Sequence, residues 1–351
     1  MPASPSPIFP RLSGIDRLVL SKKIGIDLGT SRMMVYVKGE GVVVDEPALM
    51  ATDERGERVL AVGNAAAELL RRGGKARAVR SVGEGNVVDY EVAGTMLQFL
   101  IGRIVGRQRI FRPDVMLSIP PAVGGVQRRA VLEATMQAGA RTAYLIEKPL
   151  AAAIGARLPV ATTDGLLVAN LGAGSTEVAA IANGEVLAME SIVTGGRAID
   201  EAIATRFEAE HQMSLQPGEA ERLKLQLGSA TGNERGAVMD VSAIDGSGRV
   251  TRVAVPSSLV QDAIADALRL IAASVRRVMA EVPSVRRASV QRNGLILTGG
   301  GARLAGLAEH LAAKVQMPVR VASQPEACIA LGTGMALDNL AMVRRGQHYI
   351  T

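Results

Sequence analysis

Residues 23–44 read KIGIDLGTSRMMVYVKGEGVVV, and this stretch decides the fold. An apolar run ends at Asp27, a glycine turn follows it, and two further apolar runs come after the turn. This pattern predicts a buried strand, a tight turn and two more strands. A weaker copy, LVANLGAGSTEVAAIA, begins roughly 140 residues later and places Asn170 where the first copy has Asp27. Two such copies indicate a duplicated α/β fold with a cleft between its halves.

The rest of the chain alternates between helical and strand patterns. Apolar residues at helical spacing predict helices at 91–105, 124–138, 149–157, 198–210, 218–227, 258–281 and 303–315. Short apolar or alternating runs predict strands at 114–119, 143–146, 238–243, 250–255, 294–298 and 319–321. We therefore expect mixed or parallel sheets that are covered by helices.

Three glycine-rich turns, at 27–30, 170–175 and 298–302, each follow an apolar strand. Glycine lets backbone N–H groups approach an anion closely, so the first two turns together could clamp a polyphosphate. The third precedes the helix predicted from Arg303, which would place a nucleoside against a helix N-terminus. Any one of them alone could be a plain tight turn, but three in this order favour a nucleotide site. None is a Walker loop, because GxxxxGK[ST] does not occur.

The composition is that of a folded protein from a reducing compartment. Hydrophobic residues make up 48% of the chain but aromatic residues only 2%, so Ala, Val, Leu, Ile and Met must build the core. The single cysteine, Cys328, excludes an intramolecular disulfide framework. No apolar run approaches the roughly 18 residues of a membrane-spanning helix, and the N-terminus is a poor signal peptide. We expect a cytoplasmic protein.

The formal net charge of +6 suits an anionic partner, either lipid or nucleic acid. The sequence has no zinc-ligand spacing and no basic stretch interleaved with aromatic residues, so we expect no nucleic-acid partner. An amphipathic stretch with cationic Arg11 and Arg17 overlaps and follows the Pro-rich N-terminus. Its side chains predicted to enter an anionic membrane surface are Ile8, Phe9, Leu12, Ile15 and Leu18. A disordered tail or an arm packed on the protein is the alternative.

Six segments resemble the successive nucleotide-site motifs of the actin, Hsp70 and sugar-kinase superfamily. They are IGIDLGTSR, EKPLAAAIGA, LVANLGAGSTEVA, ERLKLQLGSA, LILTGGGARLAGL and ALGTGMAL. Within that superfamily the chain resembles the MreB family of bacterial actin homologues, from about residue 23 to about residue 340. The segments DEP at 45–47, VVDYEV at 87–92 and FRP at 111–113 strengthen this narrower resemblance.

The resemblance implies an actin-like α/β fold. It would consist of two duplicated ribonuclease-H-like domains with a nucleotide cleft between them, each domain carrying a smaller subdomain. The implied divisions are 1–21 for an N-terminal membrane-binding segment; 22–50, 91–158 and 320–351 for subdomain IA; 51–90 for IB; 159–198 and 256–319 for IIA; and 199–255 for IIB.

The resemblance also implies that ATP and Mg²⁺ are the cofactors. Asp27 would lie near Mg²⁺ and act on it through water. The residues implied to contact the nucleotide are Gly29, Thr30 and Ser31 in the first turn, Gly172, Ala173 and Gly174 in the second, Gly299, Gly300, Gly301 and Ala302 in the third, and Glu221 and Lys224 on one helix. A surface salt bridge would explain Glu221 and Lys224 equally well, because they lie on one helix face.

Two positions depart from the family pattern at the place of ATP hydrolysis. The family carries Glu-Glu-Pro, whose second Glu orients the attacking water, where this chain has Glu147-Lys148-Pro149. A protonated Lys148 has no acceptor, and Glu147 is a doubtful substitute because adjacent side chains of a strand point to opposite faces. Asn170 replaces an Asp that helps to hold the metal's water shell, whereas Ser175 keeps the hydroxyl of the family's Thr. We expect impaired hydrolysis; the alternative is a site in which Lys148 binds the terminal phosphate.

The resemblance implies a self-polymerising cytoskeletal protein at the inner face of the cell membrane. Its partners would be the membrane-embedded cell-wall elongation machinery, and its role the organisation of cell-wall synthesis and rod shape. A second membrane contact is implied at Ile110 and Phe111, unless Phe111 packs into its own domain.

Three other functions stay open, since the fold alone does not separate them. A small-molecule kinase would need a carboxylate base facing its substrate, and no clear candidate is present. A chaperone ATPase would need a substrate-binding domain after the ATPase unit, and we do not expect one in a chain that ends at Thr351. A non-polymerising adaptor that only binds nucleotide is compatible with the two lost carboxylates.

Overall fold

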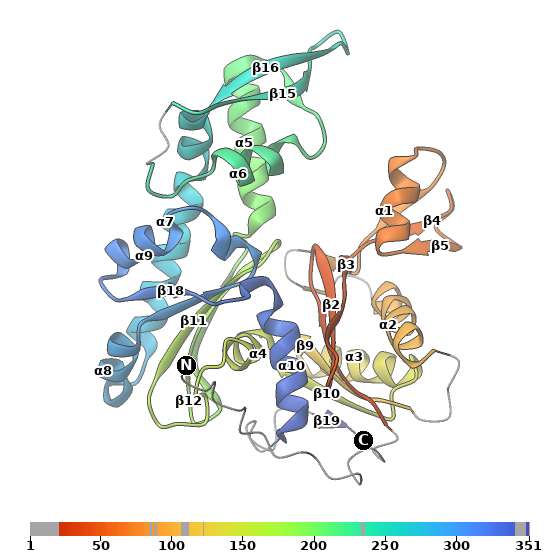
Figure 1. The fold of residues 1–351 in the computed structure, drawn as a ribbon, viewed down its shortest axis with the longest axis vertical. Coiled ribbons are helices and arrows are strands. Elements are labelled where there is room, and N and C mark those ends of the chain that lie inside the picture. Colours follow the sequence, from red (N-terminus) through yellow and green to blue (C-terminus); the bar gives the residue numbers. More distant parts are fainter. Residues whose placement is uncertain are drawn as a thin grey trace, which may run out of the picture.

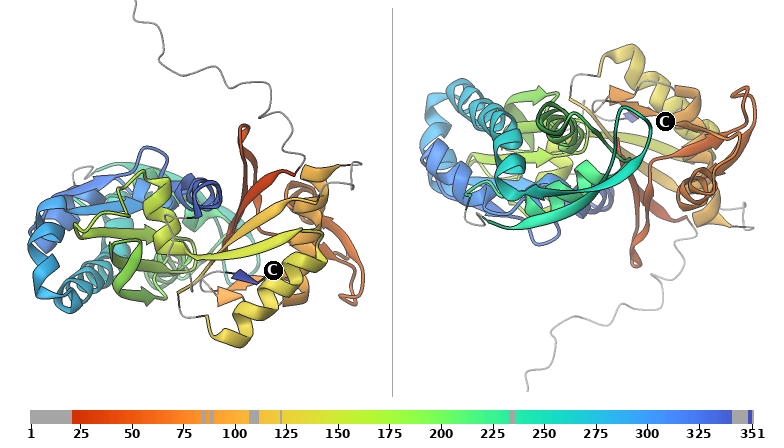
Figure 2. Two further views of the ribbon diagram at one scale, coloured as in Figure 1. Left: turned by 90° about the horizontal axis from the view of Figure 1, so that it is seen from below. Right: turned by 90° about the horizontal axis from the view of Figure 1, so that it is seen from above.

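The computed structural model describes residues 21–83, 86–87, 90–106, 112–121, 123–232, 236–340 and 349–350. Two sheets form the centres of two halves that lie side by side (Figures 1 and 2). The first has the order β19-β10-β9-β1-β2-β3 and the second the order β13-β12-β11-β17-β18. The strands of the first are β1 (Lys23–Leu28), β2 (Arg32–Val37), β3 (Gly41–Pro47), β9 (Asp114–Ile119), β10 (Thr142–Glu147) and β19 (Tyr349–Ile350). Those of the second are β11 (Leu166–Leu171), β12 (Thr176–Ala182), β13 (Glu185–Ile192), β17 (Leu295–Thr298) and β18 (Val319–Val321).

The two sheets are built on the same plan. β1 pairs antiparallel with β2 and parallel with β9, and β11 pairs in the same way with β12 and β17. In the turn after β1, the N–H of Gly29 donates to the carbonyl of Arg32 at 3.0 Å. In the turn after β11, the N–H of Gly172 donates to the carbonyl of Ser175 at 2.9 Å. The duplicated α/β architecture predicted from the sequence is confirmed.

Helices pack on the sheets in three groups (Figure 1). The first sheet is covered on one face by α2 (Tyr90–Val105) and α3 (Gly125–Gln137). The second sheet packs against α7 (Ser257–Glu281), α8 (Ser284–Asn293) and α9 (Leu307–Val315). Between the two sheets lie α4 (Lys148–Gly155) and α10 (Cys328–Asp338).

Successive side chains of one strand enter different cores. Val115 and Leu117 of β9 pack with α2 and α3, whereas Met116 between them packs with α4 and α10. In β11, Ala169 joins the core under α7 and Val168 joins the core between the sheets. Because both faces are buried, the central strands are apolar without interruption. The expected core of aliphatic residues and Met is confirmed, with Phe207 the largest fully buried side chain among the described residues.

Each half carries a smaller group of elements, drawn at the upper part of Figure 1. In the first half it consists of α1 (Asn64–Arg71), β4 (Met50–Thr52), β5 (Val59–Val62) and β6 (Arg77–Val79). In the second half it consists of α5 (Gly196–His211), α6 (Glu219–Leu227), β14 (Ser214–Leu215), β15 (Val238–Ile244) and β16 (Val250–Pro256). A two-stranded sheet of β7 (Val82–Gly83) and β8 (Asn86–Val87) precedes α2. The exact limits of the four subdomains stay a prediction.

Glycines bring α4 and α10 into backbone contact. A Cβ atom on Gly155 would overlap the carbonyl of Cys328, and a Cβ atom on Gly332 would overlap the carbonyl of Ala151. Only glycine fits at such crossings, where two backbones touch. Burial raises the pKa of the Cys328 thiol to about 11, so this cysteine is a packing residue rather than a reactive thiol.

Most predicted helices and strands agree with the structure to within a few residues, but one helix start was wrong. The predicted helix at 303–315 begins only at Leu307, after a 3₁₀ turn over Gly300–Arg303. Gly306 has φ 69° and caps the helix in a left-handed conformation, which prevents an earlier start. Helices α1, α8 and α10 were not predicted from the sequence. α10 is buried nearly all round, so it lacks the amphipathic period on which the prediction relied.

Replacing Gly332 by Ala should lower the free energy of unfolding by at least about 1–3 kcal/mol, because the helices must separate to admit one methyl group. The measurement is urea unfolding without nucleotide. Gly102→Ala in α2 is the matched control, since a Cβ atom there meets nothing within 4 Å. It should stabilise the helix by about 0.5–1 kcal/mol. Equal effects of the two substitutions would show that the crossing does not limit stability.

Candidate functional site

The two hairpin turns face each other across the boundary between the halves. Arg197, in the first turn of α5, links them. Its backbone N–H donates to the carbonyl of Ala173 in the second turn at 2.8 Å, and its Nη2 donates to the carbonyl of Thr30 in the first turn at 2.8 Å. The turn residues 29–31 and 172–174, which the sequence analysis selected, are therefore brought together.

Two glycines that the sequence analysis did not select support the second turn. A Cβ atom on Gly195 would lie only 2.6 Å from the carbonyl oxygen of Ala173. The N–H of Gly196 donates to the carbonyl of Gly172 at 2.9 Å. Because α5 starts here, the positive end of its dipole lies beside the turn and favours an anion. The sequence feature that could have identified these glycines is a Gly-Gly pair directly before a helical pattern.

Asp27 lies at the end of β1, directly before the first turn. Its Oδ1 accepts a hydrogen bond from Ser118 Oγ at 2.7 Å. Burial raises the pKa of Asp27. The charge of Lys148 and the hydrogen bond from Ser118 oppose this rise, whereas the charge of Glu177 adds to it. Asp27, Lys148 and Glu177 thus form one electrostatically connected cluster.

Glu177 in β12 is a candidate that the sequence analysis missed. Only 1% of it is exposed. Its Oε2 accepts a hydrogen bond from Asn170 Nδ2 at 2.7 Å, and its Oε1 accepts one from Ser175 Oγ at 2.5 Å. Asn170 Oδ1 in turn accepts a weaker hydrogen bond from Thr298 at 3.3 Å. The site thus keeps a buried carboxylate next to position 170. The sequence feature that could have identified Glu177 is its single charge within the otherwise apolar strand TEVAAIA.

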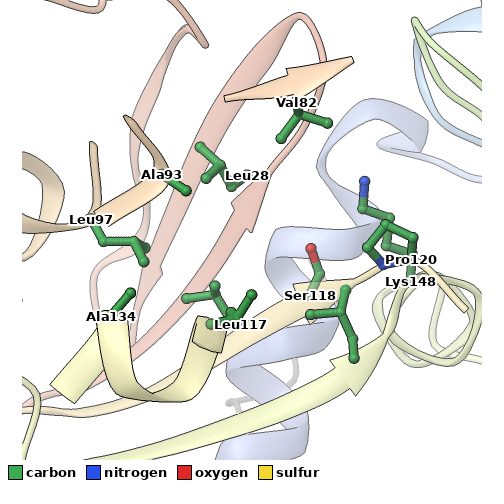
Figure 3. A pocket seen from close by; sticks show the side chains of 11 residues that line it. Leu28, Val82, Ala93, Leu97, Leu117, Ser118, Pro120, Ala134 and Lys148 are labelled. Carbon is green, nitrogen blue, oxygen red and sulfur yellow. The ribbon is translucent and has the colours of Figure 1, made fainter. Parts of the chain in front are cut away.

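Lys148, the first residue of α4, is only 5% exposed. Figure 3 shows it near Ser118 and Pro120, at one end of a mainly apolar pocket that Leu28 also lines. Within the described part of the chain its ammonium group has no hydrogen-bond partner. Glu147, the adjacent carboxylate, pairs instead with Arg128 at 2.9 Å. The buried ammonium is therefore balanced only through space, by the nearby carboxylates.

The third glycine turn packs on the end of β11. Gly299 has φ 81°, and a Cβ atom at this residue would lie 2.9 Å from Asn170 Oδ1. This contact places residues 299–302 beside the second turn. The helix expected directly after them begins only at Leu307, because Gly300–Arg303 form a 3₁₀ turn. The 3₁₀ turn, rather than the start of α9, therefore lies next to the third glycine turn, and a nucleoside at this place stays a prediction.

Glu221 and Lys224 do not form the simple surface pair that was one alternative. Lys224 Nζ lies 2.7 Å from Asp200 Oδ1 and donates to the carbonyl of Gly196 at 3.2 Å. Burial raises the pKa of Asp200, and its contact with Lys224 opposes the shift. Lys224 therefore lies beside the second turn, whereas Glu221 is exposed.

The residues predicted to touch the membrane lie outside the described residues. They are Ile8, Phe9, Leu12, Ile15, Leu18, Ile110 and Phe111.

The sequence model of the family described as MreB/Mbl protein matches residues 21–345. The chain belongs to the MreB/Mbl family. Cell shape-determining protein MreB of Escherichia coli is 35% identical over 339 residues, covering 93% of this chain and 96% of that protein. Cell shape-determining protein Mbl of Bacillus subtilis is 32% identical over 324 residues, covering 92% and 97%.

Solved structures agree with this assignment. The crystal structure of MreB5 of Spiroplasma citri bound to ADP matches with a TM-score of 0.85 and 26% identity, covering 92% of this chain and 97% of that one. The MamK double helical filament matches with a TM-score of 0.77 and 18% identity, covering 91% and 99%, and so shows the fold alone. The predicted actin-like fold is confirmed.

The charged groups of this MreB/Mbl chain fit a magnesium ion that keeps its water. Mg²⁺ prefers oxygen ligands and usually retains several waters beside one or two carboxylates. Asp27 supplies a carboxylate, whereas both oxygens of Glu177 in the same cluster accept hydrogen bonds from Asn170 and Ser175. One carboxylate suits a magnesium ion that keeps most of its water.

Replacing Asp27 by Asn should raise the thermal unfolding midpoint of the nucleotide-free protein by a few degrees at neutral pH. Burial raises the pKa of Asp27, so the folded protein is destabilised by holding the ionised form. The gain should shrink as the pH falls through this raised pKa, because protonated Asp27 carries no charge.

Thermal unfolding followed by circular dichroism from pH 8 down to about pH 4 measures this difference. Asp262→Asn, at an exposed position, is the control and should show no such pH dependence. A loss of stability in Asp27→Asn at neutral pH would mean that attraction to Lys148 outweighs the cost of burial.

Proposed function

We propose that this chain is an ATP-binding cytoskeletal protein that forms membrane-associated filaments and hydrolyses ATP slowly. One observation carries the proposal: two equivalent hairpin turns face each other, bridged by Arg197, with Asp27 directly before the first turn. Backbone N–H groups from both turns can hold a polyphosphate between the two halves. The MreB5 structures bound to ADP and to AMPPNP support a nucleotide as the ligand.

Magnesium and the nucleotide would share the charged cluster. Asp27 would hold the water shell of Mg²⁺, and Glu177 would hold Ser175 and Asn170 in place through its two hydrogen bonds. When bound, Mg²⁺ supplies positive charge that neutralises phosphate oxygens. Lys224 and the third turn would border the nucleoside.

Slow hydrolysis follows from the position of Lys148. Hydrolysis needs a group that accepts a hydrogen bond or proton from the attacking water, and an ammonium group offers only donors. Glu147 is committed to Arg128, and each oxygen of Glu177 already accepts one hydrogen bond. Lys148 is instead suited to bind a phosphate oxygen directly. The site would hold ATP better than it cleaves it.

Replacing Lys148 by Gln should increase phosphate release at saturating ATP by at least about tenfold, because the amide oxygen restores an acceptor. Lys148→Met removes the charge without adding an acceptor and is the control. If both variants are equally fast, charge alone explains the difference. A wild type already as fast as MreB of Escherichia coli would show that another group, with Glu177 the first candidate, performs the step.

Restoring Asp at position 170 is a less direct test. The substitution would place two carboxylates within hydrogen-bond distance, where Asn170 Nδ2 now donates to Glu177 at 2.7 Å. Like charges this close raise one pKa strongly, and only a nearby cation would relieve them.

Self-association into protofilaments should appear as ATP-dependent light scattering and sedimentation at micromolar to tens of micromolar protein. Head-to-tail contacts that do not close a ring generate filaments. The names of the relatives, cell shape-determining proteins, support this role. A chain that binds nucleotide but stays monomeric under these conditions would favour the adaptor alternative.

Membrane attachment would place the filaments at the cytoplasmic face of the cell membrane, next to the cell-wall elongation machinery. No described helix is long and apolar enough to cross a bilayer, so peripheral contact is proposed. Deleting residues 1–21 together with Ile110→Ser and Phe111→Ser should abolish co-sedimentation with anionic vesicles, because both apolar elements are lost. Neutral vesicles and an Arg206→Gln variant are the controls. Unaltered binding of the deletion variant would place the attachment elsewhere.

A further inference from the structure

Arg197 occupies a position that neither the family resemblance nor the glycine motifs assign. Its backbone is fixed to Ala173 in the second turn, and its guanidinium reaches across to the carbonyl of Thr30 in the first. A charged guanidinium bonded to one carbonyl oxygen keeps several unused donors. The group therefore stands between the two turns with capacity to bind an anion there.

A second arginine approaches the same turn from the first half. Arg80, which follows β6, donates through Nη1 to the carbonyl of Ala48 at 3.4 Å. The N–H of Ala48 in turn donates to the carbonyl of Ser31, in the first turn, at 2.9 Å. Burial and the positive charge of Arg197 lower the pKa of Arg80, so the two guanidinium groups lie within electrostatic range of each other.

No carboxylate neutralises this pair among the described residues. Neither Arg80 nor Arg197 forms an ion pair, although many other arginines of the described chain do, for example Arg128 with Glu147. Neighbouring like charges repel, and a bound anion between them would relieve the repulsion.

We propose that Arg197, assisted by Arg80, is the residue that distinguishes a nucleoside triphosphate from a diphosphate by binding the terminal phosphate. This inference rests on the proposed nucleotide site and names its specificity determinant. Arginine suits the task because its planar fork matches phosphate oxygens. Since Arg197 is attached to the second turn and reaches the first, binding the terminal phosphate would also strengthen the link between the two halves.

The test is calorimetric titration of the full-length protein with AMPPNP and, separately, with ADP, both with Mg²⁺. Arg197→Gln should weaken AMPPNP binding by about tenfold or more, the usual effect of losing a hydrogen bond to a charged group. Its affinity for ADP should change by less than about threefold, because ADP lacks the terminal phosphate. Arg197→Lys should recover part of the lost affinity for AMPPNP. Arg80→Gln should lose less affinity than Arg197→Gln, and again more for AMPPNP than for ADP.

Arg206→Gln is the matched control, because Arg206 lies on the same helix at an exposed position and pairs with Glu210. It should leave both affinities unchanged, and similar melting temperatures would show that all variants fold. If Arg197→Gln weakens AMPPNP and ADP equally, or weakens neither, the residue only joins the turns and the inference is wrong. A wild-type protein that binds neither nucleotide would instead overturn the proposed function itself.

Discussion

The backbone contact between α4 and α10 is the constraint on which the rest of the molecule depends. These helices lie between the two sheets, and the glycines at their crossing let one helix touch the carbonyl groups of the other. α4 begins with Lys148, and α10 packs on β1, the strand that ends near Asp27. A separation at the crossing would therefore move two charged groups of the site relative to each other. Close packing of this kind transmits small displacements, because protein interiors leave little free volume.

The acidic and basic groups of the candidate site differ in how they are paired. The acidic groups are engaged: Asp27 accepts from Ser118, and Glu177 accepts from Asn170 and Ser175. The basic groups Lys148 and Arg197 have no carboxylate within ion-pair distance among the described residues. Such a site is prepared for a multiply charged anion, whose binding supplies the missing partners.

The departures from the family pattern are concentrated where hydrolysis would occur. The glycine turns keep equivalent hydrogen bonds in both halves, from Gly29 to Arg32 and from Gly172 to Ser175. Lys148 and Asn170 alter only side chains, and Asn170 is integrated into a hydrogen-bond network with Glu177 and Thr298. The backbone geometry of the turns is therefore independent of the side chains at positions 148 and 170.

The sequence alone determined the duplicated sheets, most helices and the three glycine turns, because these features depend on local periodicity and on the conformational freedom of glycine. It also predicted Asp27 and Lys148 as site residues, and the structure shows that their charges interact. It did not reveal α10, because a helix buried on every side has no polar face to set a period.

Only the tertiary structure placed Glu177 against Asn170, and Arg197 against Thr30. The first pair belongs to facing strands of one hairpin, and the second joins opposite halves of the molecule. The first contact depends on the register of that hairpin, and the second on how the two halves pack, which spacing along the chain does not give. Local chemistry thus decided which residues could bind a phosphate, and packing between distant segments decided which charges meet there.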